Sequence, residues 1–266
     1  MDGVKLRRTS VGFWSEPQRT LAHMNDFWSA TRKTARFIKD AALETVWPTR
    51  CCLCDAPGFT LCPSCERDLP YLDRWTACPT CGAAFGLIQC TECSPVRLER
   101  LNRSRIPFDE CASAVRFTAE TGRIVRTFKD QGEQRLTLDM ARLMHACIHP
   151  EWDLDAVAFI PASSSALIRR GFDHGELLAR AFCAETGLAL VNALDRPDSK
   201  DQRALSRAER IRNLTGRFDA RPDACRRRSI LLIDDVLTTG STLFDATDAL
   251  REAGARSVFC LTFARV

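Results

Sequence analysis

Apolar runs and amphipathic stretches alternate along the second half of the chain. Short apolar runs predict buried strands at 111–117, 156–160, 188–194, 230–233 and 257–264. Apolar residues at helical spacing predict helices between these strands, at 121–129, at 136–147, in a segment that closes at Gly187, and at 243–253. Because strands and helices alternate in this order, we expect an α/β fold, a doubly wound parallel sheet with helices on both faces.

Changes in composition divide the chain into three parts. Residues 1–20 are polar and basic. A helix is predicted over 21–46 because apolar residues from Phe27 to Ala42 roughly mark one side, and Pro48 ends it. We therefore expect an N-terminal extension with a helix at 1–47, a small cysteine-rich domain at 48–106 and the α/β domain at 107–266. Within the last domain, loops are predicted at 163–176 and 196–202, and a short helix follows the second loop.

Charge and hydrophobicity limit the possible classes of function only in part. A hydrophobic content of 45% supports a core, and the net charge of +4 does not by itself demand a polyanionic partner. Residues 203–228 carry nine arginines against three acids, so they could meet pyrophosphate or nucleic acid, or form a solvated helix face. Neither a secretion signal nor a membrane-spanning run is visible, and we expect a cytoplasmic protein with reduced cysteines.

Eight of the fourteen cysteines form four Cys-x-x-Cys pairs. Two such pairs supply four thiolates, the ligand set of a tetrahedral structural zinc site, and a segment with little apolar mass needs metal in place of a core. We predict two zinc ions held by neighbouring pairs, although interleaved pairs or redox-active cysteines would share this spacing. Cys52 is a competitor for the place of Cys51. The predicted ligands are Cys51, Cys54, Cys62, Cys65, Cys78, Cys81, Cys90 and Cys93.

An acidic pair and a hydroxyl-rich turn follow the apolar run at 230–233. Asp234 and Asp235 are expected at the carboxyl end of the strand, facing solvent, and the turn 238–242 leads into a helix. Helix-start N–H groups and turn hydroxyls bind phosphate, and Gly240 lets the backbone approach an anion closely. The carboxylates could hold sugar hydroxyls or a metal ion, so a ribose 5-phosphate fits these groups. The alternative is an ordinary surface turn after a core strand.

This stretch resembles the signature of type I phosphoribosyltransferases, which bind 5-phosphoribosyl 1-pyrophosphate (PRPP) with Mg²⁺. The resemblance implies a type I phosphoribosyltransferase-like domain in which the two acids contact the ribose hydroxyls and the turn wraps the 5-phosphate. The implied PRPP-binding residues are Asp234, Asp235, Leu237, Thr238, Thr239, Gly240, Ser241 and Thr242. The implied catalytic residues are Asp234, Asp235 and Arg170. Arg170 is the first candidate for the pyrophosphate, with Lys129 or an arginine of the loop that begins at residue 196 as alternatives.

Four ordered motifs and the cysteines resemble the competence protein F (ComF) family, phosphoribosyltransferase-like proteins with a double zinc ribbon. The motifs are FKDQGE (128–133), RGFDHGELLA (170–179), QRALSRAERIRNLTGRF (202–218) and ILLIDDVLTTGSTL (230–243). The family usually has an aromatic residue where this chain has Asp130, and Asn and Gln where it has Asp173 and His174. It also usually has a proline in place of Phe159 and an arginine in place of Ala166.

The resemblance implies one of two functions. The first is transfer of phosphoribosyl from PRPP to a base, with release of pyrophosphate. The second is a non-catalytic accessory role in natural transformation, in which the chain handles single-stranded DNA with DNA-uptake proteins and PRPP is a regulatory ligand. Arg100, Arg103 and Arg105 are predicted DNA contacts. A continuous basic stripe would favour DNA, whereas scattered arginines would favour a zinc ribbon that braces the fold or docks a protein.

Overall fold

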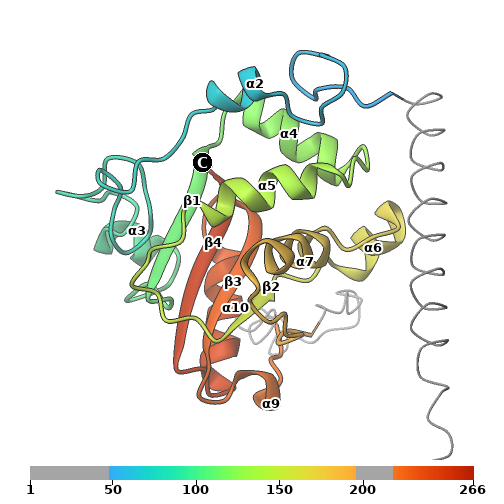
Figure 1. Ribbon diagram of the computed structural model, residues 1–266. Coiled ribbons are helices and arrows are strands. Elements are labelled where there is room, and N and C mark those ends of the chain that lie inside the picture. The colour runs from blue at the N-terminus through green and yellow to red at the C-terminus, as the bar shows by residue number, and fades with distance from the viewer. Residues whose placement is uncertain (1–47, 196–217) are drawn as a thin grey trace, which may run out of the picture. The chain divides into compact units, whose positions relative to one another are not determined.

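A parallel four-stranded sheet carries the fold in the computed structural model, which describes residues 48–195 and 218–266 (Figure 1). The strands are β1 (Glu110–Arg116), β2 (Ala156–Phe159), β3 (Ser229–Leu237) and β4 (Ser257–Arg265), in the spatial order β1-β4-β3-β2. All three strand pairs are parallel, so the predicted α/β fold with a parallel sheet is confirmed. The helix predicted at 21–46 and the arginine-rich segment at 203–217 lie outside the described residues.

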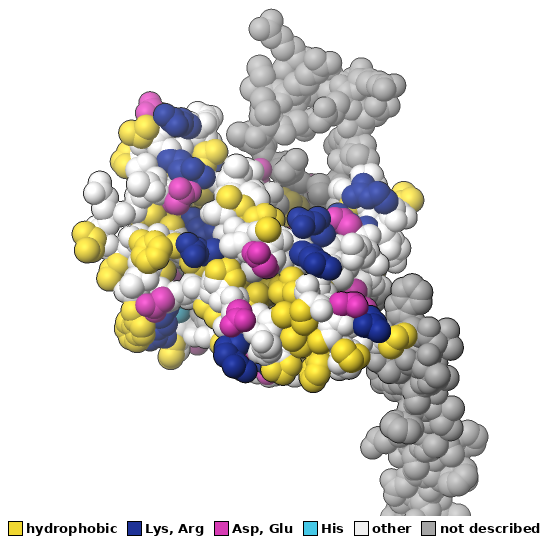
Figure 2. Space-filling view, turned by 90° about the horizontal axis from the view of Figure 1, so that it is seen from above, with side chains coloured by type: hydrophobic (Ala, Val, Ile, Leu, Met, Phe, Trp, Pro, Cys, Tyr) yellow, Lys and Arg dark blue, Asp and Glu magenta, His cyan; other side chains and the backbone are white. Residues whose placement is uncertain are grey.

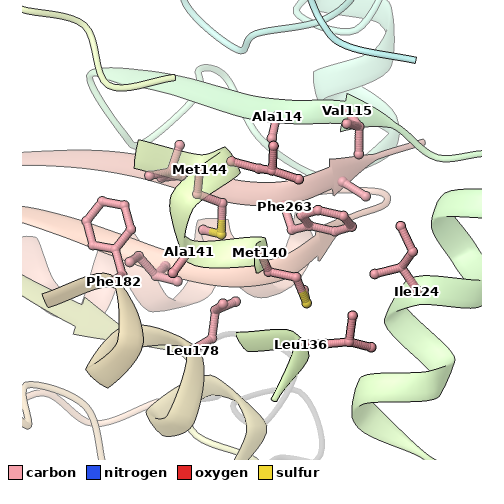
Figure 3. Close-up of a cluster of buried hydrophobic side chains, with 14 of the residues drawn as sticks. Ala114, Val115, Ile124, Leu136, Met140, Ala141, Met144, Leu178, Phe182 and Phe263 are labelled. Carbon is pink, nitrogen blue, oxygen red and sulfur yellow. The ribbon is translucent and has the colours of Figure 1, made fainter. Parts of the chain in front are cut away.

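Helices cover both faces of the sheet. The elements α4 (Ala119–Lys129), α5 (Leu136–His145) and α7 (His174–Thr186) share one apolar core with the sheet. In this core Met140 and Met144 lie beside Phe263, and Phe182 lies farther away, near Ala141 (Figure 3). The other face packs against α10 (Ser241–Glu252) and α9 (Pro222–Cys225). Alternation along β3 divides its apolar side chains between the two cores, and Leu231 and Ile233 face the α5 side.

The predicted strand at 188–194 is wrong. Leu190 makes an isolated parallel bridge to Val157, and Leu194 makes an isolated antiparallel bridge to Ala220. The Val191 N–H donates to the Val157 carbonyl at 2.8 Å, but the chain then leaves the edge of the sheet to meet the segment before α9. Residues 188–194 therefore make only one isolated β-bridge to each of two segments and no continuous ladder of strand hydrogen bonds, although their apolar side chains are typical of a strand.

The predicted loop at 163–176 contains a helix, α6 (Ser164–Arg170), and the start of α7. The Ser163 hydroxyl caps α6 by accepting from the Ala166 N–H, and Gly171 ends it with φ +75°. Asp173 then caps α7. Both start signals and the glycine stop are present in the sequence, but the apolar periodicity needed to recognise so short a helix is absent.

The cysteine-rich segment packs directly on the sheet and its helices, and Arg50–Val266 forms one compact unit. The cysteine-rich segment includes two short helices, α2 (Pro63–Arg67) and α3 (Pro95–Arg100). The Cys111 N–H of β1 donates to the Thr80 carbonyl at 2.9 Å, and Arg142 of α5 pairs with Glu66 at 2.6 Å. The boundary proposed at residue 107 remains a prediction. Among the described helices, none has the length and apolar character that crossing a membrane requires.

Candidate functional site

The first cysteine cluster lies around the start of α2. The sulfur atoms of Cys51, Cys54, Cys62 and Cys65 all lie within 4.8 Å of one another. The Cys62 N–H donates to Cys51 Sγ, and the Cys65 N–H donates to Cys62 Sγ. Burial opposes ionisation of Cys51, but backbone N–H donors overcome it and lower the pKa of this thiol to about 6. Burial instead raises the pKa of Cys52 to about 12, which favours Cys51 as the ligand.

The second cluster, Cys78, Cys81, Cys90 and Cys93, also has its sulfur atoms within 4.8 Å of one another. The distances are 3.7 Å from Cys78 Sγ to Cys93 Sγ and 3.6 Å from Cys81 Sγ to Cys90 Sγ. Four thiolates held about 2.3 Å from a central zinc ion would stand about 3.8 Å apart. Neighbouring Cys-x-x-Cys pairs therefore come together as predicted, and both clusters fit a structural metal ion such as zinc.

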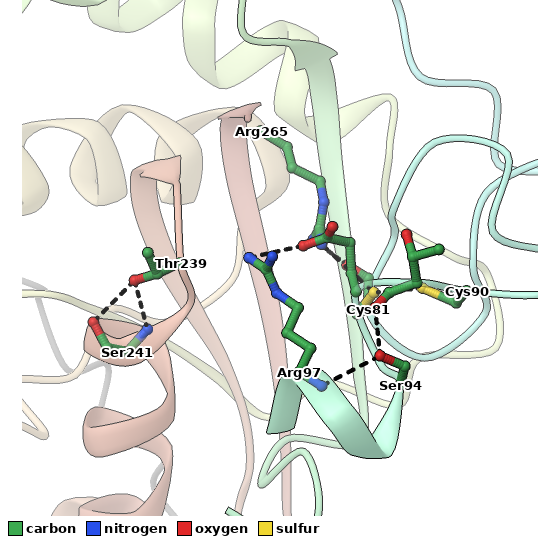
Figure 4. A network of polar contacts seen from close by, with 9 residues as sticks. Cys81, Cys90, Ser94, Arg97, Thr239, Ser241 and Arg265 are labelled. Atoms are coloured by element: carbon green, nitrogen blue, oxygen red, sulfur yellow. Dashed lines mark hydrogen bonds and ion pairs between the residues drawn. The ribbon is translucent and has the colours of Figure 1, made fainter. Parts of the chain in front are cut away.

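The hydroxyl-rich turn joins β3 to α10 at the carboxyl edge of the sheet. Leu237 is the buried last residue of β3, while Thr238, Thr239 and Ser241 are exposed. The Thr239 and Ser241 hydroxyls lie 3.2 Å apart, and the Ser241 N–H points to the Thr239 oxygen (Figure 4). Gly240, the N-cap of α10, has no side chain to cap the helix, so among the described residues the N–H groups that follow Ser241 in the first turn are available to an anion.

Gly240 is required by the shape of this turn. Its φ is +87°, in the left-handed region that side chains with a Cβ rarely adopt. A Cβ at this position would lie only 2.9 Å from Phe244 Cζ. A side chain at position 240 would therefore disturb both the backbone conformation of the turn and its close contact with Phe244 in the first turn of α10.

The acidic pair does not face solvent as the sequence led us to expect. β3 continues through both acids, and Asp234 is 8% exposed and Asp235 3% exposed. Lys129, at the end of α4, reaches Asp235 with Nζ 2.8 and 3.1 Å from its two carboxylate oxygens. Burial and the neighbouring carboxylate raise the pKa of Asp234 well above its usual value, whereas the Lys129 ammonium overcomes burial to lower the pKa of Asp235. The negative charge of the pair therefore resides on Asp235.

Arg170 and His174 complete the surroundings of the acids. Arg170 Nη2 pairs with Asp130 Oδ1 at 3.1 Å, and its Nε is buried with no hydrogen-bond partner among the described residues. His174 Nδ1 lies 3.5 Å from Arg170 Nη1, and ligand atoms of His174, Asp234 and Asp235 fall within 4.8 Å of one another. Burial, the largest influence, lowers the pKa of His174 to about 4, so the imidazole is neutral near pH 7.

The fold thus gathers every predicted site residue of the α/β domain at one edge of the sheet. Arg170 and the alternative Lys129 both approach the acids, one through His174 and the other directly. Sequence reasoning did not assign a role to His174 or to Asp130. Their departure from the family motifs was the only signal, because neither residue stands in a pattern that periodicity could interpret.

A parallel α/β sheet with buried acids and a hydroxyl-rich turn at its carboxyl edge, beside two four-cysteine clusters, is the set of features that the resemblance to the competence protein F family implies. Curated proteins to which this chain is similar carry the competence protein name. Competence protein F of Haemophilus influenzae is 26% identical over 145 residues, which cover 51% of this chain and 63% of the relative. Competence protein ComFC of Bacillus subtilis is 27% identical over 222 residues, covering 79% and 85% of the two chains.

The name of a further curated relative refers to the use of DNA. The DNA utilization protein YhgH of Salmonella typhimurium is 26% identical over 230 residues, covering 80% of this chain and 96% of the relative. Among solved structures, orotate phosphoribosyltransferase from Aeropyrum pernix matches with a TM-score of 0.32 and 15% identity, over 58% of this chain and 80% of that chain. No family model matches the chain. The resemblance to the competence protein F family, first found in the sequence motifs, is confirmed by the names of the curated relatives.

Proposed function

We propose that the chain binds PRPP together with Mg²⁺ at the carboxyl edge of the sheet. The observation that carries this proposal is the sequence of groups along β3 and α10: two buried acids, an exposed hydroxyl turn and an uncapped helix N-terminus. The turn Leu237 to Thr242 surrounds the 5-phosphate, and Asp234 and Asp235 receive the ribose 2- and 3-hydroxyls. A ligand with a phosphate beside a diol matches both halves of this site.

The cations around the acids suit the other end of PRPP. Lys129 forms an ion pair with Asp235, and Arg170 forms an ion pair with Asp130. The pyrophosphate, with its bound Mg²⁺, would draw these side chains toward its oxygens, since phosphate oxygens are strong acceptors for guanidinium and ammonium groups. Binding of PRPP therefore includes an exchange of ion-pair partners within the site.

This site would support phosphoribosyl transfer when an acceptor base is present. The base nitrogen forms a bond to C1 of the ribose while the bond from C1 to the pyrophosphate oxygen breaks. Pyrophosphate leaves with the bonding electron pair, and the base nitrogen releases its proton to solvent. Asp234 and Asp235 orient the ribose for this step, and Arg170 stabilises the charge that develops on the leaving group. The same residues serve a regulatory PRPP site if no acceptor is bound.

Calorimetric titration tests the proposal. The chain is titrated with PRPP and, separately, with ribose 5-phosphate, in the presence of Mg²⁺. We expect the double variant Asp234→Asn with Asp235→Asn to bind neither ligand, and Asp223→Asn, an exposed acid on α9, to bind both normally. Unchanged PRPP affinity in the double variant would refute the proposal. Incubation of the wild-type chain with PRPP and a panel of bases, followed by pyrophosphate detection, then separates catalysis from binding alone.

The accessory role with single-stranded DNA is the second candidate, favoured by the name of the Salmonella relative. Basic side chains on the face seen in Figure 2 are scattered among acidic ones and form no single stripe there. Arg103 is also engaged, because it pairs with Asp245 at 2.8 Å and Asp248 at 2.6 Å on α10. Of the three arginines predicted to contact DNA, Arg100 and Arg105 remain exposed.

Fluorescence anisotropy with a labelled oligonucleotide across a salt series tests this second role. If the chain uses roughly four to six phosphate contacts, its affinity should fall by roughly 1.7 to 2.5 orders of magnitude between about 50 and 200 mM salt. Replacing Arg100 and Arg105 by Ala should flatten this dependence and leave PRPP affinity unchanged. If no oligonucleotide binds at low salt, the cysteine-rich segment acts as a brace or a protein-docking module instead.

A further inference from the structure

Arg265, the last residue of β4, is a buried cation without an acidic partner. The residue as a whole is only 7% exposed. In the parts of the chain that the structure describes, no carboxylate forms an ion pair with it, and its hydrogen bonds go to Cys81. A buried guanidinium without a counter-ion is costly by several kcal/mol, so a compensating negative charge is required close by.

That charge is available in the second cysteine cluster. Arg265 Nη1 donates to the Cys81 carbonyl, and Nη2 lies 3.6 Å from Cys81 Sγ (Figure 4). Cys81 itself is 3% exposed, and Cys78 is 6% exposed. Four thiolates around one divalent cation carry a net charge of −2, and two of these four sulfurs belong to residues that water barely reaches. The negative charge of the metal-loaded cluster and the positive charge of Arg265 thus compensate each other where water reaches neither.

Each cluster has two buried cysteines, but the clusters differ in their other two, since Cys90 and Cys93 of the second cluster are both half-buried. In the first cluster Cys54 is exposed, so water can solvate part of its charge. In the second cluster the nearby Arg97 is already paired with Glu92 at 2.9 Å, and its side chain is 38% exposed. Arg265 is therefore the cation that serves the buried side of the second cluster.

We propose that Arg265 is the resident counter-ion of the second four-cysteine metal site, and that it fastens this site to the carboxyl end of β4. The proposal rests on a divalent metal ion, zinc, being bound by Cys78, Cys81, Cys90 and Cys93. It assigns a positioning role: Arg265 stabilises the thiolate form of the cluster and holds the Cys81 backbone, but it does not ligate the metal.

This attachment reaches the candidate PRPP site. β4 pairs with β3 so that Arg265 stands opposite Leu237, and the Val266 N–H donates to the Leu237 carbonyl at 3.0 Å. The residue that anchors the second metal site is therefore next to the residue that begins the phosphate turn. Such a connection explains how a cysteine-rich segment can brace the α/β domain at its functional edge.

Metal release from the zinc-loaded full-length chain tests the proposal. Zinc is removed by an excess of a chromogenic chelator, and the time course of release is followed for the wild type and for Arg265→Ala. Loss of a residue that supports metal ligands typically weakens metal binding by about 10- to 100-fold. We expect one of the two release phases to accelerate by at least about tenfold while the other keeps its wild-type rate. Arg265→Lys should restore part of the difference because it keeps the charge.

Arg116→Ala is the matched control. Arg116 ends β1, is exposed and stands opposite Arg265 in the sheet register. Both arginines line a hollow of about 530 Å³ that Cys90 of the second cluster also lines. Removal of the Arg116 side chain should leave both phases unchanged. Wild-type release from both sites in Arg265→Ala would overturn the proposal, as would equal acceleration of both phases, which indicates general destabilisation.

Cadmium-113 NMR keeps the test decisive if Arg265→Ala does not fold. In the cadmium-loaded chain, the resonance that disappears in Cys54→Ser identifies the first site, and the remaining resonance belongs to the second. In Arg265→Lys, a shift confined to the second resonance supports the proposal. An unmoved second resonance, or equal shifts of both, contradicts it.

Discussion

Replacing Lys129 by Met removes the cation that holds Asp235 in its charged form. The carboxylate lies inside the protein with 4% of its side chain exposed, whereas 25% of the Lys129 side chain is exposed. Met keeps the length and helix propensity of the side chain, so α4 should persist. The variant therefore isolates the ion pair from the helix that carries it.

The distances set the size of the effect. Two unit charges about 3 Å apart attract each other by roughly 5 to 6 kcal/mol at an effective dielectric constant of about 20. Breaking a buried pair by removing one partner costs about 3 to 5 kcal/mol, and the exposed quarter of Lys129 lowers this figure through solvent screening. We expect Lys129→Met to lose about 2 to 3 kcal/mol of folding free energy at pH 7.5. In a chain of this size that corresponds to a Tm lower by roughly 4 to 12 °C.

The loss should depend on pH in a defined direction. In the wild type the pKa of Asp235 is lowered by folding, so its contribution to stability is present above the unfolded pKa near 4 and disappears below the lowered folded value. In the variant the main influence that lowers the pKa of Asp235 is gone, so burial, the largest remaining influence, raises this pKa and the folded variant takes up a proton as the pH falls from neutrality. The difference in stability between the two proteins should therefore narrow between pH 7.5 and pH 5.5.

Thermal unfolding with saturating zinc at both pH values measures this difference. Lys129→Arg should remain close to the wild type because it keeps the charge. Arg126→Met is the matched control, since it removes an exposed cation from the same helix. A Tm of Lys129→Met within 1 to 2 °C of the control at pH 7.5, or a difference that widens at lower pH, would refute the assignment of the charge to Asp235.

Three further predictions concern the turn, the histidine and the metals. Gly240→Ala should weaken PRPP binding at least about tenfold in calorimetry. Gly58→Ala is the control, because Gly58 has a similar φ of +85° but stands in open space. This control should lose only about 1 to 2 kcal/mol of folding free energy. Stability should fall by roughly 2 to 3 kcal/mol as the pH drops from 6.5 toward 4, because His174 has a pKa near 4 in the fold, and His174→Gln should remove this part of the denaturation profile. Native mass spectrometry should find two zinc ions per chain, and Cys54→Ser or Cys90→Ser should each lose one; less than one zinc in the wild type contradicts the ligand assignment.

Local patterns predicted the parts of this fold that depend on neighbours in sequence. The apolar run at 230–233 and the capping glycine at 254 are properties of a few consecutive residues, and they define β3 and the end of α10 correctly. The cysteine clusters follow the same logic, because a Cys-x-x-Cys pair and its nearest neighbour are joined by short segments. Short connections make local pairing geometrically favourable over interleaving.

Long-range partners could not be predicted in this way. The sequence contains Lys129 and Asp235, yet nothing in either stretch shows that the end of α4 meets β3 across 106 positions. The burial of both acids has the same origin. The length of β3 depends on its pairing with β4, which extends to Leu237 opposite Arg265, and that pairing draws the acids into the sheet.

The departures from the family motifs acquire different meanings once the contacts are known. Asp173 is 6% exposed, and its carboxylate accepts from the N–H groups of Gly175, Glu176 and Ala162. It therefore acts as a helix cap and a loop anchor, and it does not present a free acid to an incoming pyrophosphate. Asp130 differs, because its half-exposed carboxylate pairs with Arg170, the guanidinium assigned to that pyrophosphate. Of these two substituted acids, only Asp130 competes with the ligand for a cation, so it is the departure that bears on PRPP affinity.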